Sequence, residues 1–225
     1  MPRQLSFDLP AREALGREDF FVAPSNAHAV AMIDAPDWPV PQLALTGPEG
    51  AGKTHLAHVW AARTGAPIVA AHGLAAADIP ALAAGPVAVE DVPAIAGDAP
   101  GLEALFHLFN LTKAAAHPLL MTGRPAPRHW ALSLADIQSR IESACHVALE
   151  PPDDTLLAAL LAKLFADRQI TPKPDVIPYL VPRIERSFSA AQGVVDLLDR
   201  AALAEGRTLS RALAARVIAE TPGED

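Results

Sequence analysis

The chain has 225 residues, of which 18 are Lys or Arg and 26 are Asp or Glu, so its formal net charge is −8. A protein whose main task is to grip a nucleic-acid backbone needs an excess of basic residues, because neutralising phosphates supplies most of that affinity. The charge balance therefore argues against a dedicated DNA-binding domain. The hydrophobic content of 51% suffices for a packed core and excludes general disorder.

Cysteine usage and the apolar runs indicate a soluble protein of the cytoplasm. Cys145 is the single cysteine, which leaves no intramolecular disulfide and no cysteine-based zinc site. Residues 1–10 lack the uninterrupted apolar stretch of a secretory signal. No run of about 18 apolar residues is free of charges and prolines, so we expect no membrane-spanning helix.

From the N-terminus to about residue 150, short apolar runs alternate with segments of helical periodicity. Five runs have the character of buried strands: residues 43–46, 68–71, 87–89, 119–121 and 146–149. The segments between them predict helices over about 26–35, 53–63, 74–83, 101–116 and 132–143. This alternation is typical of an α/β domain, here with a five-stranded parallel sheet covered by helices on both faces.

The pair Pro151-Pro152 ends the alternation. Beyond it the periodicity predicts only helices, over residues 155–168, 172–185, 189–205 and 210–220. We therefore expect an extended tail over residues 1–14, an α/β domain over 15–150 and a small all-helical domain over 151–225.

Residues 47–54 read Gly-Pro-Glu-Gly-Ala-Gly-Lys-Thr and match the phosphate-binding pattern GxxxxGK[ST]. The motif follows a predicted strand and opens a predicted helix, where a Gly-rich loop can turn its N–H groups toward phosphates. Its glycines are Gly47, Gly50 and Gly52. We predict a site for ADP or ATP in which Lys53 contacts the outer phosphates and the Thr54 hydroxyl ligates Mg²⁺.

Two further strand ends carry polar side chains that suit this site. The apolar run over residues 87–89 is followed by Glu90 and Asp91. We expect Glu90 on the metal side and Asp91 facing the attacking water, the alternative being a solvated acidic loop. The next strand ends at Thr122, whose hydroxyl either contacts the γ-phosphate or the water, or belongs to an ordinary strand end.

The P-loop, the acidic and polar strand ends and the helical domain together resemble the AAA+ family of P-loop ATPases. Ser139-Arg140-Ile141, and then Leu149 to Asp154, resemble the corresponding stretch of the DnaA replication initiators. The resemblance implies that Arg140 is an arginine finger that reaches across a subunit interface; without it, Arg140 is a surface arginine on an amphipathic helix. It also implies an adenine pocket over residues 20–26, with Phe21 and Asn26 as base-binding residues.

The resemblance covers about residues 15–220, and we expect the AAA+ core alone, with no DNA-binding domain, as in Hda-like regulators of DnaA. The segment Gln4-Leu5-Ser6-Phe7-Asp8-Leu9 is similar to peptides that bind the DNA polymerase sliding clamp. In it Gln4 would form hydrogen bonds while Leu5, Phe7 and Leu9 fill an apolar pocket. The alternative is an edge segment that packs on its own domain.

The resemblance thus implies a regulator that, tethered to the sliding clamp, stimulates hydrolysis of DnaA-bound ATP and prevents re-initiation. Two departures, Ser189 in the place of the usual lid arginine (sensor 2) and Glu90 where Asp is usual, predict weak hydrolysis by the chain itself. Two alternatives stay open: a stand-alone P-loop ATPase or phosphotransferase with Asp91 positioning the nucleophile, and a helicase-loader-type adaptor. The sequence also leaves open a homo-oligomer.

Overall fold

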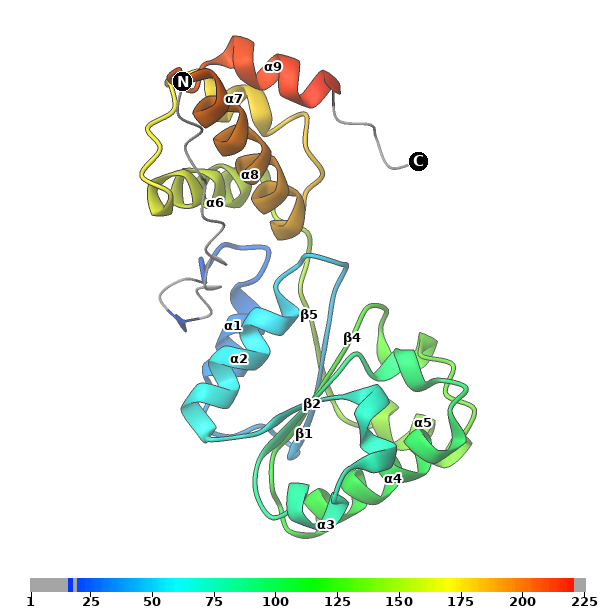
Figure 1. The fold of residues 1–225 in the computed structure, drawn as a ribbon. Coiled ribbons are helices and arrows are strands. Elements are labelled where there is room, and N and C mark those ends of the chain that lie inside the picture. Colours follow the sequence, from blue (N-terminus) through cyan, green and yellow to red (C-terminus); the bar gives the residue numbers. More distant parts are fainter. Residues whose placement is uncertain (1–15, 18–19, 221–225) are drawn as a thin grey trace.

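The computed structural model describes residues 16–17 and 20–220, so the clamp-type peptide with Gln4, Leu5, Phe7 and Leu9 lies outside the described residues. A five-stranded, fully parallel sheet forms the centre of the α/β part (Figure 1), with strand order β2-β3-β4-β1-β5. The strands are β1 (Gln42–Thr46), β2 (Ile68–Ala70), β3 (Val87–Glu90), β4 (Leu119–Gly123) and β5 (Cys145–Ala148). The predicted fold class is confirmed.

Helices cover both faces of this sheet because neighbouring strand residues alternate between two apolar cores. Leu43 and Leu45 of β1 pack with the helices α1 (Ala27–Asp34) and α2 (Lys53–Thr64). Ala44 lies in the core of the opposite face. That face carries η2 (Ala71–Ala76), α3 (Ile79–Leu82), η3 (Val92–Ile95), α4 (Ala99–Ala114), η4 (Pro127–His129) and α5 (Ala135–Glu142).

The three tryptophans anchor different ends of the sheet. Trp60 of α2 and Trp38 stack with ring centroids 5.4 Å apart, and the Trp38 indole donates to the carbonyl of Met32. This pair lies near Pro41 and Pro118, which precede β1 and β4. Trp130 belongs to the core of the α4 and α5 face and is 2% exposed.

The helical part, called the lid below, has its own apolar core and gathers at one end of the α/β part (Figure 1). It consists of α6 (Asp154–Asp167), α7 (Val176–Leu180), α8 (Phe188–Glu205) and α9 (Arg211–Glu220). Leu161, Phe165, Val195 and Leu198 lie fully buried at its centre. Within the described residues, no helix has the length and apolar character needed to cross a bilayer.

Two predicted helices are shorter than expected, and proline explains both. The segment over residues 74–83 splits into η2 and α3, because Asp78 caps α3 and Pro80 stands in its first turn. The helix expected over residues 172–185 is reduced to α7, which prolines flank at positions 172, 174 and 182. Proline lacks the N–H that a helix interior needs and restricts the residue before it.

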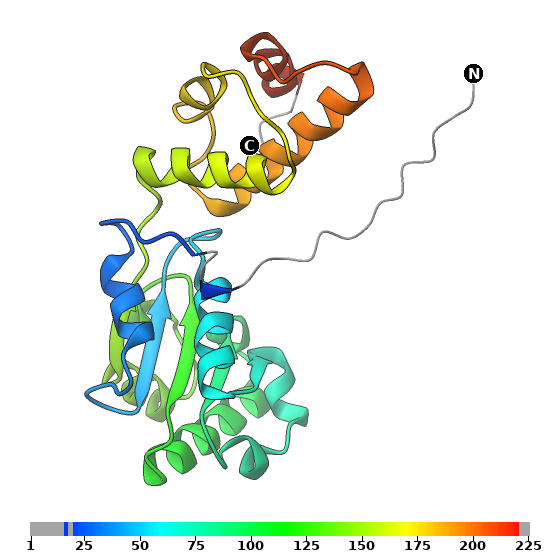
Figure 2. The same ribbon diagram turned by 90° about the vertical axis from the view of Figure 1, so that its left-hand side faces the viewer.

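The carboxyl ends of the parallel strands all lie at the edge of the sheet that faces the lid, as the arrows in Figure 2 show. The P-loop follows β1, Glu90 ends β3, and Arg124 follows β4. Topology therefore brings these three chain segments to one end of the sheet, where the P-loop contacts the first turn of α8.

Candidate functional site

The P-loop has a backbone that favours glycine at Gly50 and Gly52. Their φ angles are +65° and +95°, in the left-handed region, and Gly52 is the N-cap of α2. A Cβ on Gly52 would lie 2.8 Å from the Phe20 ring, and one on Gly50 would overlap Ser189. Both glycines are thus required by the backbone conformation and by the close approach of other chain segments.

Lys53 folds back over the loop that precedes it. Its ammonium donates to the carbonyls of Gly47, at 2.8 Å, and Pro48, at 2.7 Å. Burial lowers the pKa of Lys53, and the positive charge of Arg124 lowers that pKa further. The carboxylates of Asp91, Glu49 and Glu90 oppose this shift, so acidic and basic groups converge on the ammonium.

Asp91 and Thr122, the predicted catalytic residues after β3 and in β4, lie next to each other. The backbone N–H of Asp91 donates to the Thr122 hydroxyl at 3.0 Å, and Thr122 is 3% exposed. Asp91 has φ +55° and ψ +51°, a left-handed conformation that costs energy for a non-glycine residue. The Thr122 hydroxyl therefore holds a strained turn, while the Asp91 side chain is exposed.

The residues predicted for Mg²⁺ have the right chemistry. Glu90 ends β3, and its Oε1 is buried with no hydrogen-bond partner among the described residues. Thr54 is exposed in the first turn of α2. Carboxylate and hydroxyl oxygens are ligands that Mg²⁺ accepts, and it commonly completes its shell with phosphate oxygens and water. Glu90 and Thr54 would hold the ion, which would neutralise phosphate charge. Within residues 16–17 and 20–220, no three His, Cys, Asp or Glu side chains cluster for a metal.

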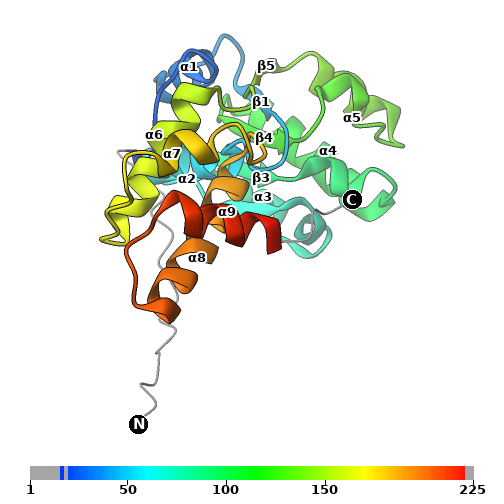
Figure 3. The ribbon, with the colours of Figure 1, turned by 90° about the horizontal axis from the view of Figure 1, so that it is seen from above.

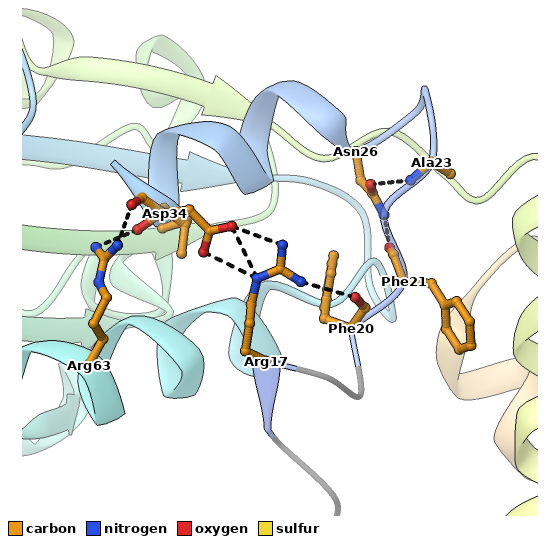
Figure 4. Close-up of polar contacts among 8 residues, drawn as sticks. Arg17, Phe20, Phe21, Ala23, Asn26, Asp34 and Arg63 are labelled. Atoms are coloured by element: carbon orange, nitrogen blue, oxygen red, sulfur yellow. Dashed lines mark hydrogen bonds and ion pairs between the residues drawn. The ribbon is translucent and has the colours of Figure 1, made fainter. Parts of the chain in front are cut away.

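Asn26, predicted as a base-binding residue, uses its amide within its own chain segment (Figure 4). Its Oδ1 accepts from the Ala23 N–H and its Nδ2 donates to the Phe21 carbonyl, both at 2.8 Å. Asn26 is 3% exposed. The side chain therefore shapes the segment that leads into α1, and its contact with a base stays a prediction.

Two arginines contact the C-terminal end of α1 (Figure 4). Arg17 donates from Nε and Nη2 to the carboxylate of Asp34, at 3.0 and 2.9 Å. Arg63 of α2 donates to the last two carbonyls of α1, those of Ile33 and Asp34, and to that of Ala35, which caps the helix. Arg17 is thus tied to the end of α1, and α1 is tied to α2, the helix that the P-loop opens.

Phe20, and not Phe21, packs directly against the P-loop. Phe20 is 3% exposed and its ring lies against Gly52. It stacks on Phe188 with centroids 5.9 Å apart and meets the His55 ring edge-on at 5.2 Å. The sequence shows two consecutive phenylalanines before α1, but it does not tell which of the two rings packs against the P-loop.

The N-terminus of α8 touches the P-loop. The Phe188 N–H donates to the Gly50 carbonyl at 2.7 Å, and the Ser189 side chain lies against Gly50. Ser187 caps α8 by accepting from the Ala190 N–H at 3.0 Å. Arg186 instead pairs with Asp154 at 2.8 Å, so its charge is engaged within the lid.

Arg140 lies apart from this cluster. It belongs to α5, and its guanidinium stands over the ring of Phe106 of α4, 5.0 Å from the centroid. Seen from above, α5 is on the opposite side of the molecule from α6 (Figure 3). The structure therefore brings together Lys53, Glu90, Asp91 and Thr122, but not Arg140.

Comparison with known proteins identifies relatives of this fold. No family model matches the chain. Over 93 residues it is 28% identical to the chromosomal replication initiator protein DnaA of Cutibacterium acnes, a stretch that covers 41% of this chain and 19% of that protein. The chain thus spans about a fifth of the length of this curated relative.

Solved structures that share the fold include two of DnaA. Domain III of the Thermotoga maritima replication initiation protein DnaA matches with a TM-score of 0.80 and 16% identity, over 94% of this chain and 98% of that domain. AMPPCP-bound DnaA from Aquifex aeolicus matches with a TM-score of 0.67 and 20% identity, over 81% of this chain and 64% of that one. The chain therefore shares the fold of DnaA domain III.

Proposed function

We propose that the chain is an Hda-like AAA+ regulator of bacterial replication initiation, which binds adenine nucleotide and stimulates hydrolysis of ATP bound to DnaA. Arg140 supplies the positive charge to the partner's γ-phosphoryl group, and residues 4–9 tether the chain to the sliding clamp. The chain's own P-loop holds ADP with Mg²⁺. The AAA+ fold shared with DnaA supports the assignment to replication initiation.

The position of Arg140 is the observation that carries this proposal. Lys53 begins α2, on one face of the sheet, whereas Arg140 lies on α5, which packs on the other face. In this proposal the Arg140 guanidinium, which is held over the Phe106 ring and not beside Lys53, meets the phosphates of a second molecule. An arginine supplied in this way can raise the rate of phosphoryl transfer by about 10³–10⁵.

The test is a hydrolysis assay with purified ATP-bound DnaA, DNA-loaded sliding clamp and the full chain. We expect stimulation by the parent protein, a loss of about 10³-fold with Arg140→Ala, and little rescue by Arg140→Lys, because lysine lacks the planar fork. Arg183→Ala, which removes an exposed lid arginine, is the matched control. If Arg140→Ala stimulates like the parent, the finger assignment is wrong.

Tethering is tested separately by deletion of residues 1–10. We expect this variant to lose both clamp binding, measured by surface plasmon resonance, and clamp-dependent stimulation, while its melting temperature stays that of the parent. A segment that orders on binding gives modest affinity, which several sites on one clamp increase. Unchanged clamp binding would refute the tether.

A second candidate is a stand-alone ATPase. The strained Asp91, the Thr122 contact and the unpartnered Glu90 oxygen favour it, because such groups gather where water and metal are positioned. A turnover assay on the isolated chain distinguishes the two: rapid hydrolysis that Asp91→Asn abolishes supports the ATPase, and slow hydrolysis supports the regulator.

A further inference from the structure

The turn after β4 lies beside the first residue of the P-loop. Strands β1 and β4 are parallel neighbours, and their register pairs Thr46 with Gly123. The residues that follow, Gly47 and Arg124, are therefore also side by side, and the Gly47 N–H donates to the Arg124 carbonyl at 3.2 Å. Strand order thus places Arg124 next to the start of the loop.

The backbone on both sides of Arg124 is held by one side chain. Trp130 packs so closely on Gly123 that a Cβ there would lie 2.7 Å from the indole. The Trp130 Nε1–H donates to the Pro125 carbonyl at 2.7 Å. The Arg124 side chain, 61% exposed, therefore extends from a fixed turn.

Arg124 reaches across the loop to Glu49. Its Nη1 lies 2.7 Å from Oε2 of Glu49, which is 70% exposed and belongs to the P-loop itself. An exposed ion pair of this kind contributes little free energy because water and salt screen both charges. A second anion at the loop can therefore replace Glu49 at small cost.

The carboxylates around the P-loop would repel the phosphates of a nucleotide, so a second cation besides Lys53 favours binding. Three carboxylates, those of Glu49, Glu90 and Asp91, act on the Lys53 ammonium. Ser189, which touches Gly50 from the lid, carries no charge. The charge of Arg124 lowers the pKa of Lys53, so the two cations act on the same space.

We propose that Arg124 is a phosphate-binding residue of the P-loop site, and that Glu49 is the anion it exchanges for the outermost phosphate of the nucleotide. The inference rests on the proposed nucleotide binding. Guanidinium suits this role because its planar fork matches phosphate oxygens and stays charged at all relevant pH values. Without nucleotide, Glu49 keeps the fork turned toward the loop.

The test is isothermal titration calorimetry of the full chain with ATP, ADP and AMP in the presence of Mg²⁺. We expect Arg124→Ala to weaken ATP binding by about 10–100-fold, ADP binding less, and AMP binding by less than about 2-fold. Glu49→Gln removes the competing anion and strengthens ATP binding by about 2–5-fold. This gain shrinks in the double variant Arg124→Ala/Glu49→Gln, where no guanidinium is left to release.

Two reference variants distinguish an error in the role of Arg124 from an error in the proposed nucleotide site. Arg183→Ala controls for the loss of one exposed positive charge and should leave ATP affinity unchanged. Lys53→Ala should weaken every nucleotide if the P-loop binds them. Unchanged ATP affinity of Arg124→Ala beside a weakened Lys53→Ala overturns the role of Arg124 alone. Equal weakening by Arg124→Ala and Glu49→Gln overturns it too, because the pair would then be a structural clamp. Absence of binding by the parent refutes the proposed nucleotide site itself.

Discussion

The P-loop edge of the sheet and the outer face of α4 and α5 hold their charged side chains in different ways. At the P-loop edge, Lys53 donates to two carbonyls and Arg124 pairs with Glu49. On the other face, the Arg140 guanidinium has no ion pair among the described residues and lies over the Phe106 ring. An aromatic ring orients a cation without neutralising it.

This difference indicates which kind of charged group each region can bind. Charges that are satisfied by their own loop can be exchanged for the charges of a bound ligand. A cation left without a counter-ion is available to a negative group on another molecule. Substitutions at the P-loop edge should therefore change stability and nucleotide binding, whereas substitutions beside Arg140 should change only the partner's reaction.

Gly52→Ala should have the largest effect on stability. The new Cβ would require a left-handed backbone at φ +95° and would lie 2.8 Å from the Phe20 ring, so we expect a loss of about 2–3 kcal/mol. The measurement is urea unfolding followed by circular dichroism. Gly193→Ala is the matched control, because its Cβ would meet nothing within 4 Å. That helix position should gain up to about 1 kcal/mol. Equal stability of the two variants would contradict the close packing of the loop.

Asn26→Ala should destabilise the chain by about 1–3 kcal/mol. The substitution leaves the Ala23 N–H and the Phe21 carbonyl without their partner in a buried place. Thermal unfolding measures the loss. Asn26→Asp keeps the acceptor for Ala23 but buries a carboxylate oxygen against the Phe21 carbonyl, so its loss should be at least as large. A variant that weakens ADP binding at unchanged stability would instead favour the base contact.

Phe106→Leu should lower the stimulated hydrolysis of DnaA-bound ATP by about 2–5-fold, the cost of one cation–π contact. Phe106→Trp, which keeps an aromatic face, should retain the stimulation, and ADP binding by both variants should match the parent. Leu111→Ala on the same helix removes an exposed apolar side chain that is not under Arg140 and serves as control. If Phe106→Leu stimulates fully, the ring does not position Arg140.

The last prediction concerns the pH dependence of ADP binding. Burial and Arg124 lower the pKa of Lys53 in the free protein, whereas a bound phosphate favours the protonated ammonium. Above the lowered pKa, ADP binding must therefore take up a proton, and affinity should fall with rising pH by at most tenfold per pH unit. Calorimetry from neutral to alkaline pH in buffers of different ionisation enthalpy measures this uptake. Lys53→Arg stays charged and should show none.

Local patterns were sufficient to predict most of the fold. The five strands and the helix after the P-loop follow from runs of apolar residues, and the loop follows from a motif of eight consecutive residues. Two expected helices were too long because clustered prolines outweigh apolar periodicity. The roles of Phe20 and Ser189 depend on how the lid packs on the loop, which no local pattern records.

The proximity of Arg124 to Glu49 was not predictable for the same reason. The two residues are 75 positions apart in the sequence, and they meet because β4 lies next to β1 in the sheet. That adjacency is a property of the strand order, in which β1 stands between the fourth and fifth strands. The P-loop motif is recognisable within one segment of the sequence, but the strand end that lies beside it depends on the strand order.

The placement of the three tryptophans has an optical consequence. Trp130 contacts the turn that carries Arg124, so its emission should respond when that turn shifts. Trp38 and Trp60 stack near the residues that precede β1 and β4, away from the P-loop. The chain thus carries an intrinsic fluorescent probe beside one end of its sheet and, at the other end, a reference pair of the same chromophore.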